Sequence, residues 1–130
     1  MKKLDEIKEM VKDAQQRWGE IRDLSCLYPL SSAGLYDKRE KLKNLIEDIR
    51  ENIEAFLTSC SPIRVEDCKS VKGVLESIFG ISEGLCVSYV FGGYNESYFI
   101  SDTINIVDGL AKRKNWAGGI SFSFFLFIFN

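Results

Sequence analysis

Aromatic, amide and basic side chains are concentrated in two short segments of the second half of the chain. The first segment surrounds the glycine pair Gly92-Gly93, and the second is the only basic run after residue 60. Aromatic rings stack on nucleobases, Arg and Lys neutralise phosphates, and an Asn amide both donates to and accepts from a base edge. The pattern indicates a site for a small nucleotide-like anion. Its candidate residues are Phe91, Tyr94, Asn95, Lys112, Arg113, Lys114 and Trp116.

The same residues also have a structural interpretation, which stays open. Alternate aromatic side chains would then belong to the core, and residues 112–116 would form a solvated loop. A long nucleic acid is a poor ligand in either case, because the net charge is −2 and such binding depends on basic residues that neutralise phosphates. Gly92-Gly93 also lacks the neighbouring Lys and Ser or Thr of a phosphate-binding loop.

Catalysis has few candidate residues in this sequence. Histidine is absent, which removes the commonest general acid and base and the usual activator of a nucleophile. Asp102 and Asp108 are the best candidates for a functional carboxylate pair, although a helix cap and a turn would account for both. We therefore expect a non-enzymatic protein without a cofactor.

The cysteines argue against a metal or redox centre. They stand at positions 26, 60, 68 and 86, and no two of them form a CxxC pair. The chain starts with Met1-Lys2-Lys3 and continues into charged amphipathic sequence without the apolar stretch of a secretory signal. We expect a cytoplasmic protein with reduced thiols and no metal.

Two heptad-like stripes dominate the first 60 residues. Apolar residues recur there at alternating steps of three and four, which is the seam of a coiled coil. The stripes are Leu4, Ile7, Val11, Ala14, Trp18 and Ile21, then Leu42, Ile46, Ile49, Ile53 and Phe56. The connecting residues 25–34 contain Pro29, Ser31, Ser32 and Gly34, so the pattern predicts an antiparallel helical hairpin.

The composition changes at Ser59–Pro62. Residues 1–60 hold 23 of the 36 charged residues, whereas residues 61–130 hold 12 of the 16 aromatic residues. We expect two units, a hairpin over 1–60 and an aromatic-rich α+β unit over 61–130. The boundary is too short for a flexible linker, so the two units should pack together as one domain.

Residues 61–130 show a mixed pattern. A helix is predicted over 66–79 with Gly80 as its stop, followed by a strand over 85–91, a turn over 92–97 and a strand over 98–100. Residues 101–114 fit either a short helix or a strand and turn, and the spacing of Ile104, Val107 and Leu110 favours the helix. The Phe-rich segment 120–129 is too short to cross a membrane, and its apolar pattern predicts a buried strand. The predicted fold class is therefore α+β.

These features favour a non-enzymatic interaction protein that binds a partner protein and forms a homo-oligomer. The hairpin or the Phe-rich terminal strand would supply the interface, because both are strongly apolar. The alternative is a protein that binds or sequesters a small nucleotide-like anion. The layout resembles accessory proteins of phages and other mobile elements in size and order of parts, without a shared motif.

Overall fold

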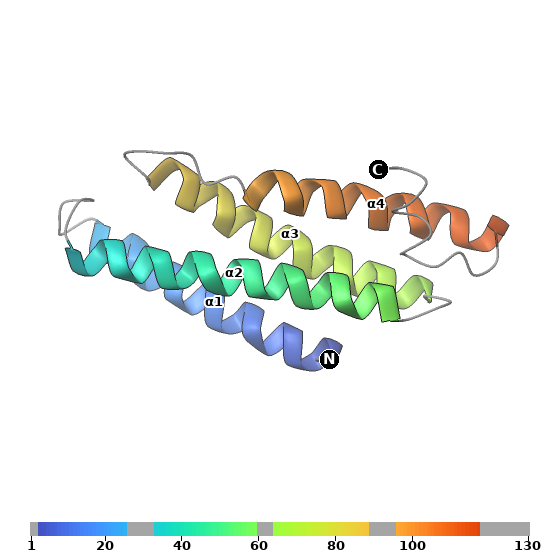
Figure 1. Ribbon diagram of the computed structural model, residues 1–130, viewed down its shortest axis with the longest axis horizontal. Coiled ribbons are helices and arrows are strands. Elements are labelled where there is room, and N and C mark those ends of the chain that lie inside the picture. The colour runs from blue at the N-terminus through green and yellow to red at the C-terminus, as the bar shows by residue number, and fades with distance from the viewer. Residues whose placement is uncertain (1–2, 26–32, 60–63, 89–95, 118–130) are drawn as a thin grey trace.

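The computed structural model describes residues 3–25, 33–59, 64–88 and 96–117, and all of these except Lys3 and Arg64 are in α-helices. The four helices of these ranges are α1 (Leu4–Ser25), α2 (Ala33–Ser59), α3 (Val65–Ser88) and α4 (Glu96–Ala117). Each helix runs opposite to the one before it, so they form an elongated antiparallel bundle (Figure 1). The helix pair predicted within residues 1–60 is present as α1 and α2.

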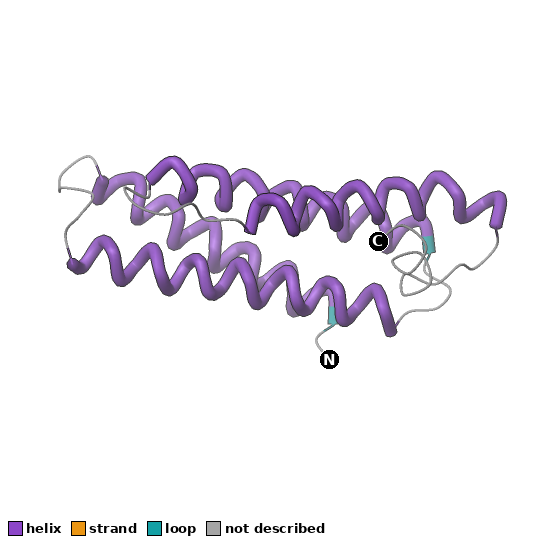
Figure 2. The backbone as a smooth tube through the Cα atoms, turned by 45° about the horizontal axis from the view of Figure 1, so that its top comes forward, coloured by secondary structure: helices purple, strands orange, loops and turns teal. Residues whose placement is uncertain are grey.

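Helix α3 occupies the centre of this arrangement. It packs against α1, α2 and α4, whereas α1 and α2 also pack against each other. Helix α4 lies along α3 at the edge of the bundle, and a second view shows the same elongated form (Figure 2). One face of α4 therefore meets the bundle and the opposite face is directed away from it.

The apolar stripes of α1 and α2 form much of the core. Ile7 and Ala14 of α1 are fully buried, as are Ile46 and Ile49 of α2. Near its end, the stripe of α2 departs from the predicted pattern, because Leu57 is fully buried and Phe56 only partly so. Since α3 packs against α1 and α2 and most side chains of both stripes are buried, the chain itself covers the hairpin surface that was predicted as an oligomer interface.

The predicted α+β fold class is wrong, because the described ranges contain helices and no strand. Leu85–Ser88, expected to begin a strand, form the last turn of α3. Tyr98–Ile100, expected to be its partner strand, lie in the first turns of α4. The remainder of the first strand (89–91) and the Phe-rich segment 120–129 fall outside the described residues.

Burial at helical spacing explains these differences. Ile78, Ile81, Ser82 and Leu85 are all buried, so the apolar face of α3 continues past Gly80, which is exposed and does not end the helix. β-propensity is a weak signal beside such a periodic buried face. The helix favoured for residues 101–114 is confirmed, although α4 begins earlier, at Glu96.

A close approach of α1 to α3 depends on Gly84. A β-carbon at Gly84 would overlap Cζ2 of Trp18 and would lie 2.8 Å from its Cη2. The half-buried indole therefore lies directly on the backbone of α3, and glycine is the residue that leaves room for it.

Candidate functional site

The start of α4 is joined to α2 by a cluster of charged side chains. Arg50 of α2 donates from Nε to Oε1 of Glu96, and from Nη1 to Oε1 of Glu54 at 2.9 Å. Thr103 of α4 donates to the same Glu54 oxygen at 3.3 Å. The side chains of Arg50 and Glu96 are only 15% and 5% exposed, so this pair is largely shielded from water.

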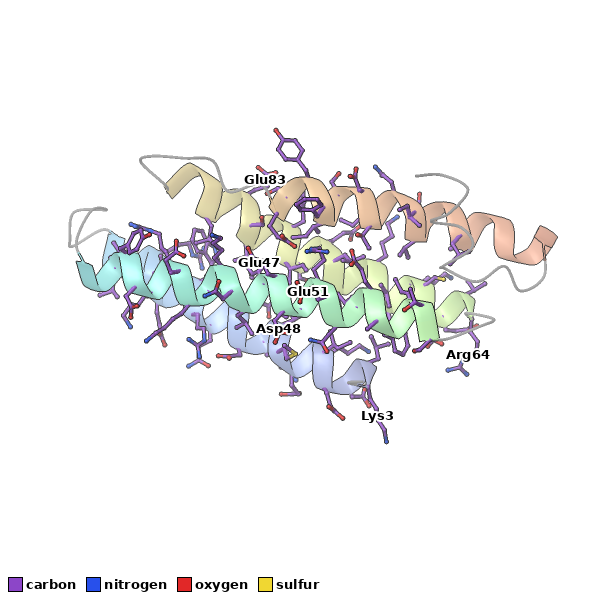
Figure 3. The ribbon with its side chains drawn as sticks, viewed as in Figure 1. Lys3, Glu47, Asp48, Glu51, Arg64 and Glu83 are labelled. Carbon is purple, nitrogen blue, oxygen red and sulfur yellow. The ribbon has the colours of Figure 1, made fainter. Side chains whose placement is uncertain are left out.

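Burial dominates the electrostatics of Glu96. Loss of solvent raises the pKa of the Glu96 carboxyl, the interaction with Arg50 lowers it, and the nearby charges of Glu47 and Glu54 raise it again. The net direction is upward. Figure 3 shows Glu47 on the side of α2 that faces α4, which accounts for its influence on Glu96. Arg50 therefore bonds two carboxylates, Glu54 and Glu96, while a third, Glu47, is near enough to raise the pKa of Glu96.

Helix α3 also contacts α4 through polar side chains. The hydroxyls of Ser82 and Ser97 are hydrogen-bonded at 2.7 Å in a buried position, and Lys72 Nζ donates to Asp108 Oδ1 at 3.0 Å. The hydrogen bond and the charge of Asp108 raise the pKa of Lys72. Polar contacts from two neighbouring helices thus fix the position and rotation of α4.

Two aromatic side chains at the start of this anchored helix remain exposed. Tyr98 is 71% exposed and Phe99 is 55% exposed. The guanidinium of Arg50 lies 5.2 Å from the centre of the Phe99 ring, at cation–π distance. Glu83 of α3 lies beside the start of α4 (Figure 3). This part of the molecule therefore combines exposed rings with several carboxylates.

The structure describes the backbone of only one half of the predicted anion site. Phe91, Tyr94 and Asn95 lie outside the described residues, although Asn95 directly precedes α4. Lys112, Arg113, Lys114 and Trp116 belong to the last turns of α4. Along a helix, the 16 steps from Glu96 to Lys112 span about 24 Å. Lys112 is thus separated by most of the helix from Glu96, the residue that follows Asn95 in the sequence.

Asp102 and Asp108 do not form a carboxylate pair. Asp108 accepts the hydrogen bond from Lys72 on the α3 side, while Asp102 is exposed on the outer face of α4. Six residues of helix turn the second position about 120° away from the first. Neither carboxylate is placed to assist the other in proton transfer.

A separate pocket of about 330 Å³ opens between α1 and α2. It is lined by Arg17, Glu20, Ile21, Gly34, Asp37, Lys38 and Lys41. Arg17 pairs with Asp13 and Lys41 pairs with Asp37, both at 3.1 Å. With three basic and two acidic side chains, the lining carries a net positive charge.

Sequence reasoning missed the cluster around Arg50 because its members are far apart in the chain. Arg50 and Glu54 belong to a segment whose mixed charges look like a solvated helix face, and Glu96 was expected in a turn. One signal was present. Ile100, Val107 and Leu110 follow Glu96 at helical spacing. This spacing could have predicted a helix that begins at Glu96 and has an acidic residue in its first turn.

Comparison with protein-family models, curated proteins and solved structures found no match for this chain. Among the described residues, no three or more His, Cys, Asp or Glu side chains are grouped to hold a metal ion. None of the described helices combines the length and apolar character needed to cross a membrane.

Proposed function

We propose that this chain is a non-enzymatic interaction protein that works as a homo-oligomer, in which a second copy binds the outward face of α4. The exposed ring of Tyr98 is the observation that carries this proposal. It lies on a helix that α2 and α3 hold in place through Arg50–Glu96 and Ser82–Ser97. An aromatic side chain on a rigid support is typical of the residues that dominate protein interfaces.

The heptad stripes do not support the interface expected from them, because their side chains are buried inside the chain. Ile7, Ile46 and Ile53 have no exposed surface left for a partner. Tyr98 and Phe99 have the surface that the stripes lack. The proposed interface is therefore on α4 and not on the hairpin.

Sedimentation velocity tests the proposal on the full chain at micromolar concentration. We expect the wild type to sediment above its monomer mass of 14.8 kDa. Tyr98→Ser should shift it to the monomer, because the substitution removes a large contact surface while touching little of the bundle. Tyr36→Ser is the matched control, since Tyr36 is also exposed, at 55%, but lies on α2.

Three results decide the matter. A Tyr98→Ser monomer together with an unchanged Tyr36→Ser oligomer would support the α4 surface. A wild type that sediments as a monomer would refute homo-oligomerisation. Equal loss of association in both variants would place the interface elsewhere.

Binding of a small anion is the second candidate function, and the positively charged pocket between α1 and α2 favours it. Its volume lies near the lower end of the range for small-molecule sites. We expect phosphate or a nucleotide from a mono- and dinucleotide panel to raise the melting temperature, since a ligand at a hundred times its Kd adds about 2.7 kcal/mol of stability.

The lysine Lys38 provides the test of this pocket. Lys38→Ala should reduce the thermal shift, because Lys38 lines the pocket. Lys12→Ala is the control, since Lys12 is an exposed lysine of α1 outside it. A shift retained in Lys38→Ala, or no shift with any compound of the panel, would reject this candidate.

A further inference from the structure

A second periodic stripe runs along α4 on the side opposite its buried face. Its positions are 98, 102, 105, 109, 112 and 116, separated by alternating steps of four and three, and they fall within about 80° of the helix circumference. Ile100 and Val107, on the far side, are fully buried. Tyr98, Asp102 and Asn105 of the stripe are exposed.

The residues of this stripe are arranged symmetrically about position 107. Tyr98 and Trp116 are equally far from it, as are Asp102 and Lys112, and Asn105 and Gly109. Two of the pairs are chemically matched, as two aromatic residues and as an acid with a base, and the third places an amide opposite a glycine. Such a sequence is complementary to itself when it is read in the opposite direction.

We infer that two copies of this chain pair through antiparallel α4 helices around a twofold axis at position 107. The inference rests on the proposed function and specifies its geometry. Each Asp102 then faces Lys112 of the other copy, and each Tyr98 faces Trp116 of the other copy. Every contact occurs twice, as a twofold interface requires.

Charge selects the antiparallel direction. A parallel pair would place Asp102 against Asp102 and Lys112 against Lys112, and like charges in contact are strongly unfavourable. The antiparallel pair turns both repulsions into attractions. Gly109 has no side chain, so it lets the two helices approach closely near the axis.

No other described helix covers the first half of this face, where Tyr98, Asp102 and Asn105 are exposed. The helix lies at the edge of the bundle (Figure 1). Its polar contacts with α2 and α3 use Glu96, Ser97, Thr103 and Asp108, none of which belongs to the stripe. The Arg50–Glu96 pair holds α4 at its start, and the Lys72–Asp108 pair holds it further along the helix. A second copy can therefore bind without displacing any element of the bundle.

Charge reversal tests the pairing. Sedimentation equilibrium would compare the self-association of the wild type with Asp102→Lys, Lys112→Asp and the double variant. We expect each single variant to weaken association by roughly tenfold or more, because like charges then face each other twice in the dimer. The double variant should return to near the wild-type value. Glu9→Lys, in an exposed pair of α1, is the control and should change nothing.

Mixing gives a second readout. In an equimolar mixture, Asp102→Lys and Lys112→Asp should form a heterodimer more tightly than either variant associates with itself. Circular dichroism would verify that both single variants are folded.

The outcomes separate the two proposals. A wild type that associates, together with single variants that associate equally well or a double variant that fails to recover, would overturn the antiparallel pairing and leave homo-oligomerisation standing. A monomeric wild type would refute both.

Discussion

The indole of Trp18 lies against the backbone of α3 at the position that a side chain on Gly84 would occupy. A β-carbon there would overlap Cζ2 of Trp18 and stand 2.8 Å from Cη2 and 3.1 Å from Cε2. The ring is held between helices α1 and α3 and has a cation, Arg22, 5.9 Å from its centre. Any side chain at position 84 must push the two helices apart or rotate the ring.

Gly84→Ala should therefore destabilise the protein by about 1–3 kcal/mol, the usual cost of overpacking a well-packed contact. Urea unfolding followed by circular dichroism would measure it. Gly80→Ala is the matched control, because it lies in the same helix with nothing within 4 Å of the added carbon. That variant should gain about 0.5–1 kcal/mol from the better helix propensity of alanine. Equal effects at both positions would contradict the packing argument.

Arg50→Ala should cost about 3 kcal/mol, because it leaves the carboxylate of Glu96 buried without its cation. The double variant Arg50→Ala/Glu96→Ala should be less destabilised than Arg50→Ala alone, since it removes that buried charge. Lys41→Ala is the control on the same helix. Its pair with Asp37 is about two-thirds exposed, so the loss should stay within about 0.5 kcal/mol. A cost for Arg50→Ala as small as that of Lys41→Ala would show that the cluster contributes no stability.

The free energy of unfolding should depend on pH through the ionisation of Glu96. Its folded pKa is raised, so the folded state binds the proton more tightly than the unfolded state does. The stability that this group contributes is therefore full below the ordinary Glu pKa of about 4.3 and falls as the pH rises through the folded pKa.

Glu96→Gln should lack this loss, because the amide does not ionise. Measured by urea unfolding from pH 4 to pH 7, the stability of the wild type should fall relative to that of Glu96→Gln as the pH rises. The remaining titratable groups are common to both proteins and cancel in the difference. A difference that is constant, or that moves in favour of the wild type, would show that the Arg50 interaction outweighs burial.

Helices α1 and α2 could be predicted from the sequence because their apolar side chains repeat regularly and face one core. The end of α3 could not. Leu85 and Val87 have the β-propensity and apolar character of a strand, and only the burial of Ile81, Ser82 and Leu85 against neighbouring helices shows that the helix continues. Propensity is a local quantity, whereas this choice depends on packing with residues far away in the chain.

The candidate site was less accessible to sequence reasoning than the fold. Arg50 and Glu96 are 46 residues apart, and each has an ordinary local context. Lys112–Lys114 were predicted to bind a ligand together with residues around Tyr94, a proposal that depended on a turn between two strands. A helix from Glu96 to Ala117 stands in place of the second strand, and the residues around Tyr94 lie outside the described part of the chain. The exposure of Tyr98 could not be predicted, because it depends on which face of α4 meets α3.

The buried face of α4 also determines the order in which parts of the molecule open. Among the side chains whose burial is described, three of the six buried in α4 are polar (Glu96, Ser97 and Thr103), whereas those buried in α3 are seven apolar residues and one serine. Because detaching α4 should expose less buried apolar surface than disrupting α3 does, α4 should open as a separate cooperative unit at a lower free energy than global unfolding. Hydrogen–deuterium exchange at low protein concentration should show faster exchange for amides of 100–110 than for those of 71–81. Under the proposed pairing of α4 with a second copy, its exchange should slow with increasing concentration, while that of α3 stays constant.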